Sequence, residues 1–236
     1  GRIGSKFIIR DYAPSIPIYA NLGAVQLNYG LEIDHCQKAI DLINADALIL
    51  HLNPLQEALQ PEGQTNFSGL LKKIELVCKR VKVPVIVKEV GWGISTQTAQ
   101  RLVNVGVACI DVAGAGGTSW ALVEKYRNSE SWRIEMCENF KDWGIPTAKN
   151  VSQLKKNLPG IPIIASGGIR NGIDAAKCLA LGASLVGAAG TLFKAAFESQ
   201  NALDQKIKQW IKEITITLFV TGSKSIRDLN IEKILD

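Results

Sequence analysis

Six short apolar runs constrain the fold of this chain more than any other feature of the sequence. Each run is rich in Val, Ile, Leu or Ala, is nearly continuous rather than alternating, and ends in Gly, Asn or a polar cluster. This is the pattern of parallel strands that are buried on both faces. The runs occupy residues 16–23, 45–53, 83–91, 107–117, 161–168 and 183–190.

Helical patterns separate these runs and predict strand–helix units. Leu70, Ile74, Val77 and Val81 share one helical face, and five further residues do the same near the C-terminus. The alternation predicts βαβ units and a parallel sheet. With 47% apolar residues and no low-complexity linker, we expect one domain over residues 1–236. The C-terminal set is Leu203, Ile207, Trp210, Ile211 and Ile214.

Two α/β architectures fit this alternation, an open doubly wound sheet and a TIM (β/α)8 barrel. The barrel is favoured because nearly every run ends in polar or glycine-rich residues, which meet on one face of a barrel. An open sheet gathers such residues at a single switch point. A closed barrel has eight strands, so we expect about the first two to be missing or truncated in this chain. Residues 2–5 are the expected stub of another strand, and the start at Gly1 suggests an absent beginning.

Charge and cysteine usage narrow the partners and the compartment. The net charge of +5 is spread along the chain, which favours a small anionic ligand over nucleic acid. There is no run of about 18 apolar residues and no signal-peptide pattern, so we expect a cytoplasmic protein without a membrane partner. The cysteines form no CxxC pair, which indicates reduced thiols. They are Cys36, Cys78, Cys109, Cys137 and Cys178.

The stretch from residue 161 to 193 predicts a phosphate site. One run ends at Ser166-Gly167-Gly168, and a helix is expected to begin near Gly172 with Asp174 in its first turn. The next run ends in residues 187–191, again rich in glycine. Glycines allow close approach of a ligand, and free N–H groups at a helix start suit a dianionic phosphate. The alternative is a pair of tight turns that merely need glycine.

Lys88 and two other strand ends suggest what the phosphate belongs to. Lys88 follows four strand residues and is expected to project at the mouth of the barrel, against an electron-rich ring. Asn21 and Thr118 are placed to hydrogen-bond to such a ring. FMN has one phosphate and one ring and fits this combination. The alternative for Lys88 is a surface lysine paired with Glu89.

The stretch HLNPLQEALQPEG, residues 51–63, gathers polar side chains directly after a buried run. Pro54 and Pro61 stiffen and close it, so it is either a surface turn or one wall of a site. It contains His51, which is one of two histidines. The other, His35, lies in a helical stretch and is expected to be solvated.

Several stretches together resemble one known family, the type 2 isopentenyl-diphosphate isomerases, which are FMN-dependent (β/α)8 enzymes. The resemblance runs from about residue 5 to about residue 229. The SGGIR part alone is shared with other FMN barrels and with inosine-monophosphate-dehydrogenase-like proteins. HLNPLQE followed by QPEG is far more specific to the isomerases. The stretches are ANLGAVQLNYG, HLNPLQEALQPEG, VPVIVKEVGWGIS, DVAGAGGTSW, FKDWGIPT, ASGGIRNGIDAAKCLALGA and FVTGS.

The resemblance implies an activity and a set of site residues. The family interconverts isopentenyl diphosphate and dimethylallyl diphosphate with reduced FMN, NADPH as reductant and Mg²⁺, and its members are typically tetramers or octamers. It implies that Gln56 lies near the alkene, that Glu57 binds Mg²⁺, and that His51 and Asn53 line the substrate pocket. The implied FMN residues are Ser5, Asn21, Lys88, Thr118, Gly168, Ile169, Arg170, Ala188 and Ala189.

The chain also departs from the family pattern at its start. The basic Arg-Lys segment that grips the diphosphate and the Ser- and Thr-rich flavin loop do not appear. A Gly-Ser-Gln-Arg-like motif is replaced by IGSKF, in which Lys6 is a doubtful stand-in. These departures put part of the diphosphate grip in doubt.

Two alternatives to the isomerase remain open at this point. One is another FMN-dependent barrel oxidoreductase, which would need a general base, often histidine, on a late strand. Both histidines precede residue 52, which argues against it. The other is a non-catalytic partial barrel that binds flavin or an interaction partner.

Overall fold

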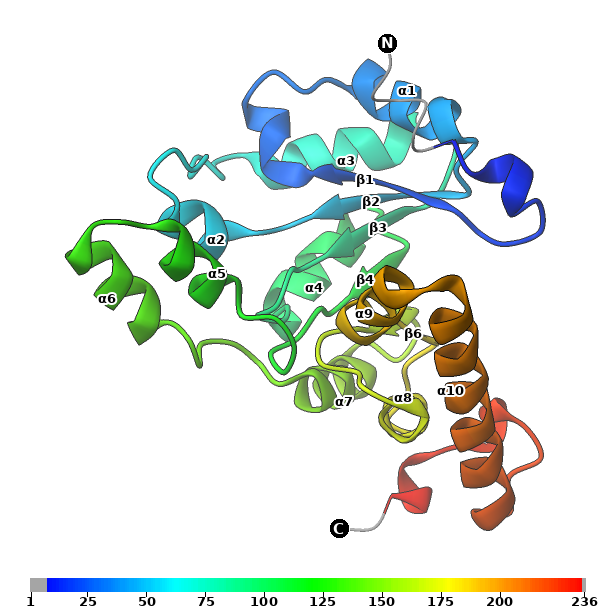
Figure 1. Cartoon of the computed structure of the whole chain (residues 1–236). Helices are drawn as coiled ribbons and strands as arrows, with labels where there is room; N and C mark the ends of the chain where they lie inside the picture. Colours follow the sequence, from blue (N-terminus) through cyan, green and yellow to red (C-terminus); the bar gives the residue numbers. More distant parts are fainter. Residues whose placement is uncertain (1–7, 235–236) are drawn as a thin grey trace.

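Six parallel strands form the centre of the fold in the computed structural model, which describes residues 8–234 (Figure 1). All six strands expected from the sequence are present. Each is shorter than its apolar run, because the polar and glycine-rich ends belong to the loops that follow the strands. The strands are β1 Tyr19–Gly23, β2 Ala47–His51, β3 Val85–Lys88, β4 Cys109–Asp111, β5 Ile163–Ala165 and β6 Leu185–Val186.

The sheet order decides between the two architectures. Every strand pairs in parallel with the next strand along the chain, in the order β1-β2-β3-β4-β5-β6. A doubly wound sheet reverses its order at a switch point, whereas a barrel adds each strand beside the last. The register aligns Gly23 with His51, His51 with Lys88, and Lys88 with Asp111. The carboxyl ends of neighbouring strands therefore lie level, as the barrel interpretation predicts.

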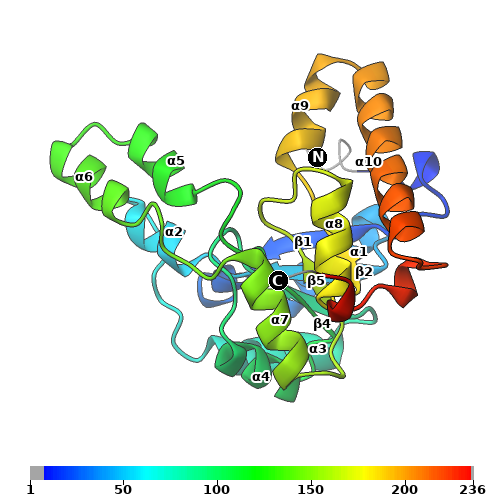
Figure 2. The same cartoon turned by 90° about the horizontal axis from the view of Figure 1, so that it is seen from below.

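Helices cover the outer face of the sheet and extend beyond its carboxyl end. Figures 1 and 2 show α2, α5 and α6 as a group on the side to which β2 points, while α9 and α10 lie side by side elsewhere. The helices are α1 Ile33–Ile43, α2 Pro54–Leu59, α3 Leu70–Arg80, α4 Thr96–Asn104, α5 Trp120–Arg127, α6 Ser131–Asn139, α7 Thr147–Asn157, α8 Gly172–Ala180, α9 Gly190–Glu198 and α10 Gln200–Val220. Short 3₁₀ turns are η2 Arg10–Tyr12, η3 Ala24–Asn28, η4 Ile226–Asp228 and η5 Ile231–Lys233.

The main core lies between the strands and these outer helices. Leu48 and Leu50 of β2 are fully buried there against residues such as Ile74 and Val77 of α3. Each buried Leu, Ile or Val side chain contributes about 1.5–3 kcal/mol relative to exposure. A smaller cluster fills the inward face of the sheet below the site. It contains Ala47, Ile86 and Ile164 with Tyr19, Ile49 and Cys109 packed against them.

The two apolar helix faces expected from periodicity, on α3 and α10, are buried to different extents. The face of α3 is confirmed, because Leu70, Ile74 and Val77 are buried. The helix α10 is also confirmed, but its apolar face is only partly covered, and Ile211 remains 59% exposed. Periodicity identifies such a face without showing what covers it. In α10 the packing comes mainly from α8 and α9, with Leu218 also in a cluster with Leu229 of the C-terminal segment.

Two further expectations concern helix starts. The predicted start of α8 at Gly172 is confirmed, since the Asn171 side chain caps the helix by accepting from the Asp174 N–H at 2.7 Å. His35 is exposed, as expected, and its ring accepts a hydrogen bond from the Glu32 N–H at the start of α1. Within residues 8–234, no helix is long and apolar enough to cross a lipid bilayer.

Candidate active site

A row of polar side chains crosses the inward face of the sheet at its carboxyl end. Because strand side chains alternate between faces, residues two places beyond the inward apolar cluster point the same way. Thus His51 lies two residues after Ile49 on the same face of β2, and Lys88 lies two residues after Ile86 on the same face of β3. We call this set the polar row, and it consists of Asn21, His51, Lys88, Asp111 and Ser166.

His51 pairs with Asn21 on the neighbouring strand β1. Its Nδ1 lies 2.9 Å from Asn21 Oδ1, so Nδ1 carries the proton that is donated to the amide oxygen. Burial lowers the pKa of His51, Lys88 lowers it further, and Glu57 partly opposes both effects. The hydrogen bond therefore fixes the orientation of the ring, and the lowered pKa favours its uncharged form.

Lys88 faces the interior and is half-buried. Its Nζ donates to the main-chain oxygen of Glu89 at 2.8 Å. The Glu89 carboxylate turns away and accepts from the N–H groups of Val90, Gly91 and Trp92 at 2.6, 2.7 and 2.6 Å. The alternative of a surface Lys88–Glu89 ion pair is therefore wrong.

Asp111 is the most deeply buried charged member of the polar row, at 6% exposed. Its Oδ1 accepts from Ser166 Oγ at 2.6 Å and from the Ala113 N–H at 3.2 Å. Burial raises the pKa of Asp111, while Ser166, Lys88 and Ala113 oppose the rise. Asp111 is not among the site residues predicted from the sequence, although it is the last residue of its strand, as Lys88 is.

A cavity of about 650 Å³ opens above the polar row. It is walled by the loops that follow β3, β4, β5 and β6. Every predicted FMN residue lines it except Asn21, which lies beside His51, and Ser5, which lies outside the described residues. The lining residues are Lys88, Val90, Gly91, Ala113, Gly114, Gly117, Thr118, Trp120, Ser166, Gly167, Gly168, Ile169, Arg170, Gly187, Ala188, Ala189, Gly190 and Thr191.

Glycines bring two walls of the cavity into direct contact. Gly168 has φ +78°, and a Cβ there would collide with the backbone of Gly116. Arg170 Nη2 donates to the Gly116 oxygen at 2.7 Å, and Thr147 Oγ1 donates to the Gly167 oxygen at 2.6 Å. These bonds hold the two loops against each other, and glycine is needed for contact as well as for conformation.

One end of the cavity is built to receive an anion. The start of α9 has Ala189 as its N-cap and no side-chain cap, so its first N–H groups remain available. Thr191 Oγ1 lines this end, is buried, and has no hydrogen-bond partner within residues 8–234. Both features suit phosphate oxygens.

Short helix α2 forms a second wall of the site and carries the predicted substrate-side residues Gln56 and Glu57, with Asn53 as its N-cap. Asn53 Nδ2 donates to Glu57 Oε1 at 2.8 Å and approaches Gln56 Oε1 at 3.4 Å. The Gln64 N–H donates to Glu57 Oε2 at 2.6 Å. Asn53 Oδ1 is buried without a partner in the part of the chain that the structure describes. The segment is therefore an ordered constellation and not a loose surface turn.

Glu124 of α5 holds this second wall in place and was missed in the sequence. Its side chain is fully buried, and its Oε1 accepts from Gln56 Nε2 at 3.2 Å and from Gln60 Nε2 at 2.8 Å. Arg127 Nη1 also donates to it at 3.2 Å. The available signal was a carboxylate three residues after Ala121, on the face of α5 that is otherwise apolar.

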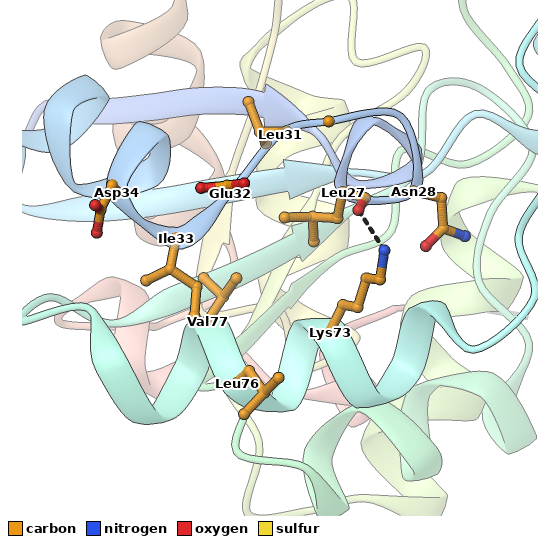
Figure 3. A pocket seen from close by; sticks show the side chains of 10 residues that line it. Leu27, Asn28, Leu31, Glu32, Ile33, Asp34, Lys73, Leu76 and Val77 are labelled. Carbon is orange, nitrogen blue, oxygen red and sulfur yellow. Dashed lines mark hydrogen bonds between the residues drawn. The ribbon is translucent and has the colours of Figure 1, made fainter.

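A second pocket lies on the outer surface, between the loop before α1 and helix α3 (Figure 3). Its volume is about 490 Å³, and its one lysine, Lys73, donates to the Leu27 oxygen at 2.6 Å. None of the predicted site residues lines it. The chemistry is therefore concentrated in the first cavity.

The sequential parallel sheet, with a glycine-walled cavity at its carboxyl end, defines an α/β-barrel class of protein with its candidate site on that face. The sequence profile of the FMN-dependent dehydrogenase family matches residues 51–236. The chain belongs to this family, which supports FMN as the group that the cavity binds.

Relatives with curated names are more specific. The chain is 49% identical over 228 residues to an isopentenyl-diphosphate delta-isomerase from Nostoc sp., covering 97% of this chain and 65% of the relative. It is 48% identical over 225 residues to a protein of the same name from Rickettsia akari, covering 95% of this chain and 66% of the relative. The chain thus spans about two thirds of the length of the curated relatives it matches.

Solved structures with low sequence identity share the fold. A putative lactate oxidase from Pediococcus acidilactici superposes with a TM-score of 0.64 at 19% identity, covering 91% of this chain and 60% of that one. A mandelate oxidase superposes with a TM-score of 0.60 at 19% identity, covering 98% of this chain and 72% of the oxidase chain. Together with the sequential parallel sheet, these matches confirm the TIM-barrel class.

Proposed function

We propose that this chain carries the flavin site and one substrate wall of an isopentenyl-diphosphate delta-isomerase. The reaction interconverts isopentenyl and dimethylallyl diphosphate. The observation that carries the proposal is the ordered group of Asn53, Gln56 and Glu57 beside the glycine-walled cavity. Its support is the 49% identity to a protein of that name. Helix α5 joins the two parts, because Trp120 lines the cavity and Glu124 contacts Gln56 one turn later.

The residues of the cavity fit FMN. The unpartnered Thr191 hydroxyl and the uncapped start of α9 suit its phosphate, and Gly168 allows the loop after β5 to contact the Gly116 backbone in the cavity wall. We assign the ring to the part of the cavity that Lys88 and Thr118 line. Reduced FMN, when bound, would supply a protonatable ring beside the substrate, and NADPH is the proposed reductant.

The residues of α2 fit a magnesium ion held together with substrate. Each oxygen of the Glu57 carboxylate accepts one hydrogen bond and keeps a further lone pair. Asn53 Oδ1 is a second hard oxygen without a partner. No group of three or more His, Cys, Asp or Glu side chains in residues 8–234 forms a metal site alone. Mg²⁺ usually takes one or two carboxylates plus phosphate oxygens, so Glu57 with the substrate diphosphate meets its needs.

The chain's own side chains bind and orient in this proposal. Gln56 is a poor acid, so we assign it to hydrogen bonding near the alkene, with Glu124 and Asn53 fixing its amide. We assign His51 to the substrate pocket, with its ring orientation fixed by Asn21. We further propose a cytoplasmic homo-oligomer, a tetramer or octamer, acting on a small-molecule diphosphate.

The oxidoreductase alternative has no histidine on a late strand to serve as its general base. The likeness to lactate and mandelate oxidases, at 19% identity, concerns the fold alone. His35 lies at the start of α1 outside the cavity, and His51 on β2 is the only other histidine of the chain.

Two measurements test the proposal. First, the purified chain is titrated with FMN, and a visible flavin spectrum that shifts on binding is expected. Second, the chain is incubated with isopentenyl diphosphate, FMN, NADPH and Mg²⁺, and the dimethylallyl isomer is expected. A chain that binds FMN without forming that isomer is a non-catalytic flavin-binding barrel, and a chain that gains no FMN refutes both enzyme interpretations.

A further inference from the structure

Lys88 and Asp111 are cross-strand neighbours on the inward face of the sheet. The β3–β4 register pairs Lys88 with Asp111 directly. Both side chains belong to the polar row beneath the cavity. Lys88 lines the cavity itself, whereas Asp111 lies deeper, at 6% exposed. A buried carboxylate next to an inward-facing lysine calls for an explanation, because burying an unpaired charge is costly.

Asp111 is held rigidly by its surroundings. Ser166 Oγ donates to its Oδ1 at 2.6 Å, and the Ala113 N–H donates to the same oxygen at 3.2 Å. Ser166 and Ala113 come from different loops of the cavity wall. The carboxylate is therefore fixed from two sides and has little freedom to follow its neighbour.

Lys88 retains donor capacity toward the cavity. An ammonium group has three protons, and one is used by the Glu89 oxygen at 2.8 Å. Burial lowers the pKa of Lys88, while Asp111 raises it most and Glu89 raises it less. The other titratable groups around it are His51 on β2 and Arg170 across the cavity. Neither of these two side chains can carry a negative charge, so only the carboxyl groups of Asp111 and Glu89 can supply one beside Lys88.

We propose that Asp111 acts through its cross-strand neighbour Lys88, whose ammonium group it keeps charged where Lys88 lines the cavity. The inference rests on the proposed function, because it takes FMN as the occupant of that cavity. Asp111 does not line the cavity, so it acts through Lys88 and not by contact with the ligand. Without Asp111, burial would favour the uncharged amine, and the cavity would lose a positive charge that suits anionic reduced flavin.

The test compares the affinities of the full chain for oxidised FMN and for chemically reduced FMN, from pH 6.5 to pH 9. In Asp111→Asn, we expect the preference for reduced over oxidised FMN to fall about tenfold at pH 8. A tenfold fall corresponds to a reduction potential of the bound FMN that is about 30 mV more negative, for a two-electron couple. The fall should shrink as the pH is lowered, because Lys88 is then protonated without help.

A double-mutant cycle separates action through Lys88 from direct action. The double variant Lys88→Gln, Asp111→Asn should show the same preference for reduced over oxidised FMN as Lys88→Gln alone. An unchanged preference in the single variant, a rise in the preference, or an equal fall in the Lys88→Gln background would each overturn the inference. If the wild-type chain binds no FMN, the cofactor proposal fails, and this inference fails with it. Normal wild-type binding with no effect of Asp111→Asn refutes only the inference.

Two further variants keep the result interpretable. Ser166→Ala replaces Asp111→Asn as the test if Asp111→Asn does not fold. It keeps the Asp111 carboxylate but removes the 2.6 Å hydrogen bond that fixes it, so we expect a smaller fall in the preference for reduced FMN. Asp204→Asn removes one negative charge from the exposed surface of α10 and should leave the preference unchanged. Circular dichroism melts establish that each variant is folded.

Discussion

Substitution of Glu124 tests whether the second wall of the site is held by α5. The Glu124 side chain is fully buried and accepts hydrogen bonds from Gln56, Gln60 and Arg127. In Glu124→Ala, the two glutamine amides each lose an acceptor, and a cavity remains where the carboxylate stood. An unsatisfied buried donor costs about 1–3 kcal/mol. Both glutamines are only partly buried, so the low end applies to each.

The expected loss of stability is therefore about 2–3 kcal/mol for Glu124→Ala. For a chain of this size, 1 kcal/mol shifts the midpoint of thermal unfolding by about 2–4 °C, so a drop of roughly 4–12 °C is expected. Differential scanning calorimetry measures the shift. The isomerisation rate should also fall, because Gln56 loses the contact that fixes its amide, whereas the Kd for FMN should stay within about twofold.

Gln60→Ala is the matched control for this prediction. It removes a neighbouring partner of Glu124, at 2.8 Å, without touching Gln56. A loss of stability without a loss of isomerisation is expected. The reasoning is refuted if Gln60→Ala and Glu124→Ala reduce the rate equally, or if Glu124→Ala weakens FMN as much as it weakens turnover.

Three further substitutions examine the metal, the cavity wall and the polar row. Glu57→Gln should weaken the Mg²⁺-dependent rate at least tenfold and leave the FMN Kd unchanged, and equal loss of both would show that Glu57 is misassigned. Gly168→Ala should abolish measurable FMN binding, because its Cβ collides with Gly116, and a normal flavin titration would contradict this. The pKa of His51 is lowered by folding, so the unfolded chain binds more protons below about pH 6.5, and stability should rise with pH through that window. Urea unfolding at pH 5.5 and 7.5 measures this rise, which should be smaller in His51→Gln.

The sequence predicted the parts of the molecule that depend on local pattern. Continuous apolar runs identified all six strands, and their polar ends indicated a barrel before any pairing was known. The glycines after the β5 run marked the cavity wall, because close backbone contact excludes every other residue there. Lys88 was placed correctly on the inward face by counting along its strand.

The contacts that were missed join residues far apart in the sequence. Glu124 is 68 residues from Gln56, and Ser166 is 55 residues from Asp111. A single carboxylate in a helix or at a strand end is usually solvated, so neither Glu124 nor Asp111 stood out. The incomplete cover of α10 was missed for a related reason, since periodicity describes one helix and not its neighbours.

Helix α5 touches both parts of the site within one turn, and this has a thermodynamic consequence. Trp120 belongs to the cavity wall, and Glu124 fixes Gln56 on the second wall. A ligand that orders the start of α5 also reduces the conformational freedom that the other ligand must remove. Flavin and diphosphate should therefore bind with positive coupling. By linkage, the factor by which FMN tightens the diphosphate equals the factor by which the diphosphate tightens FMN.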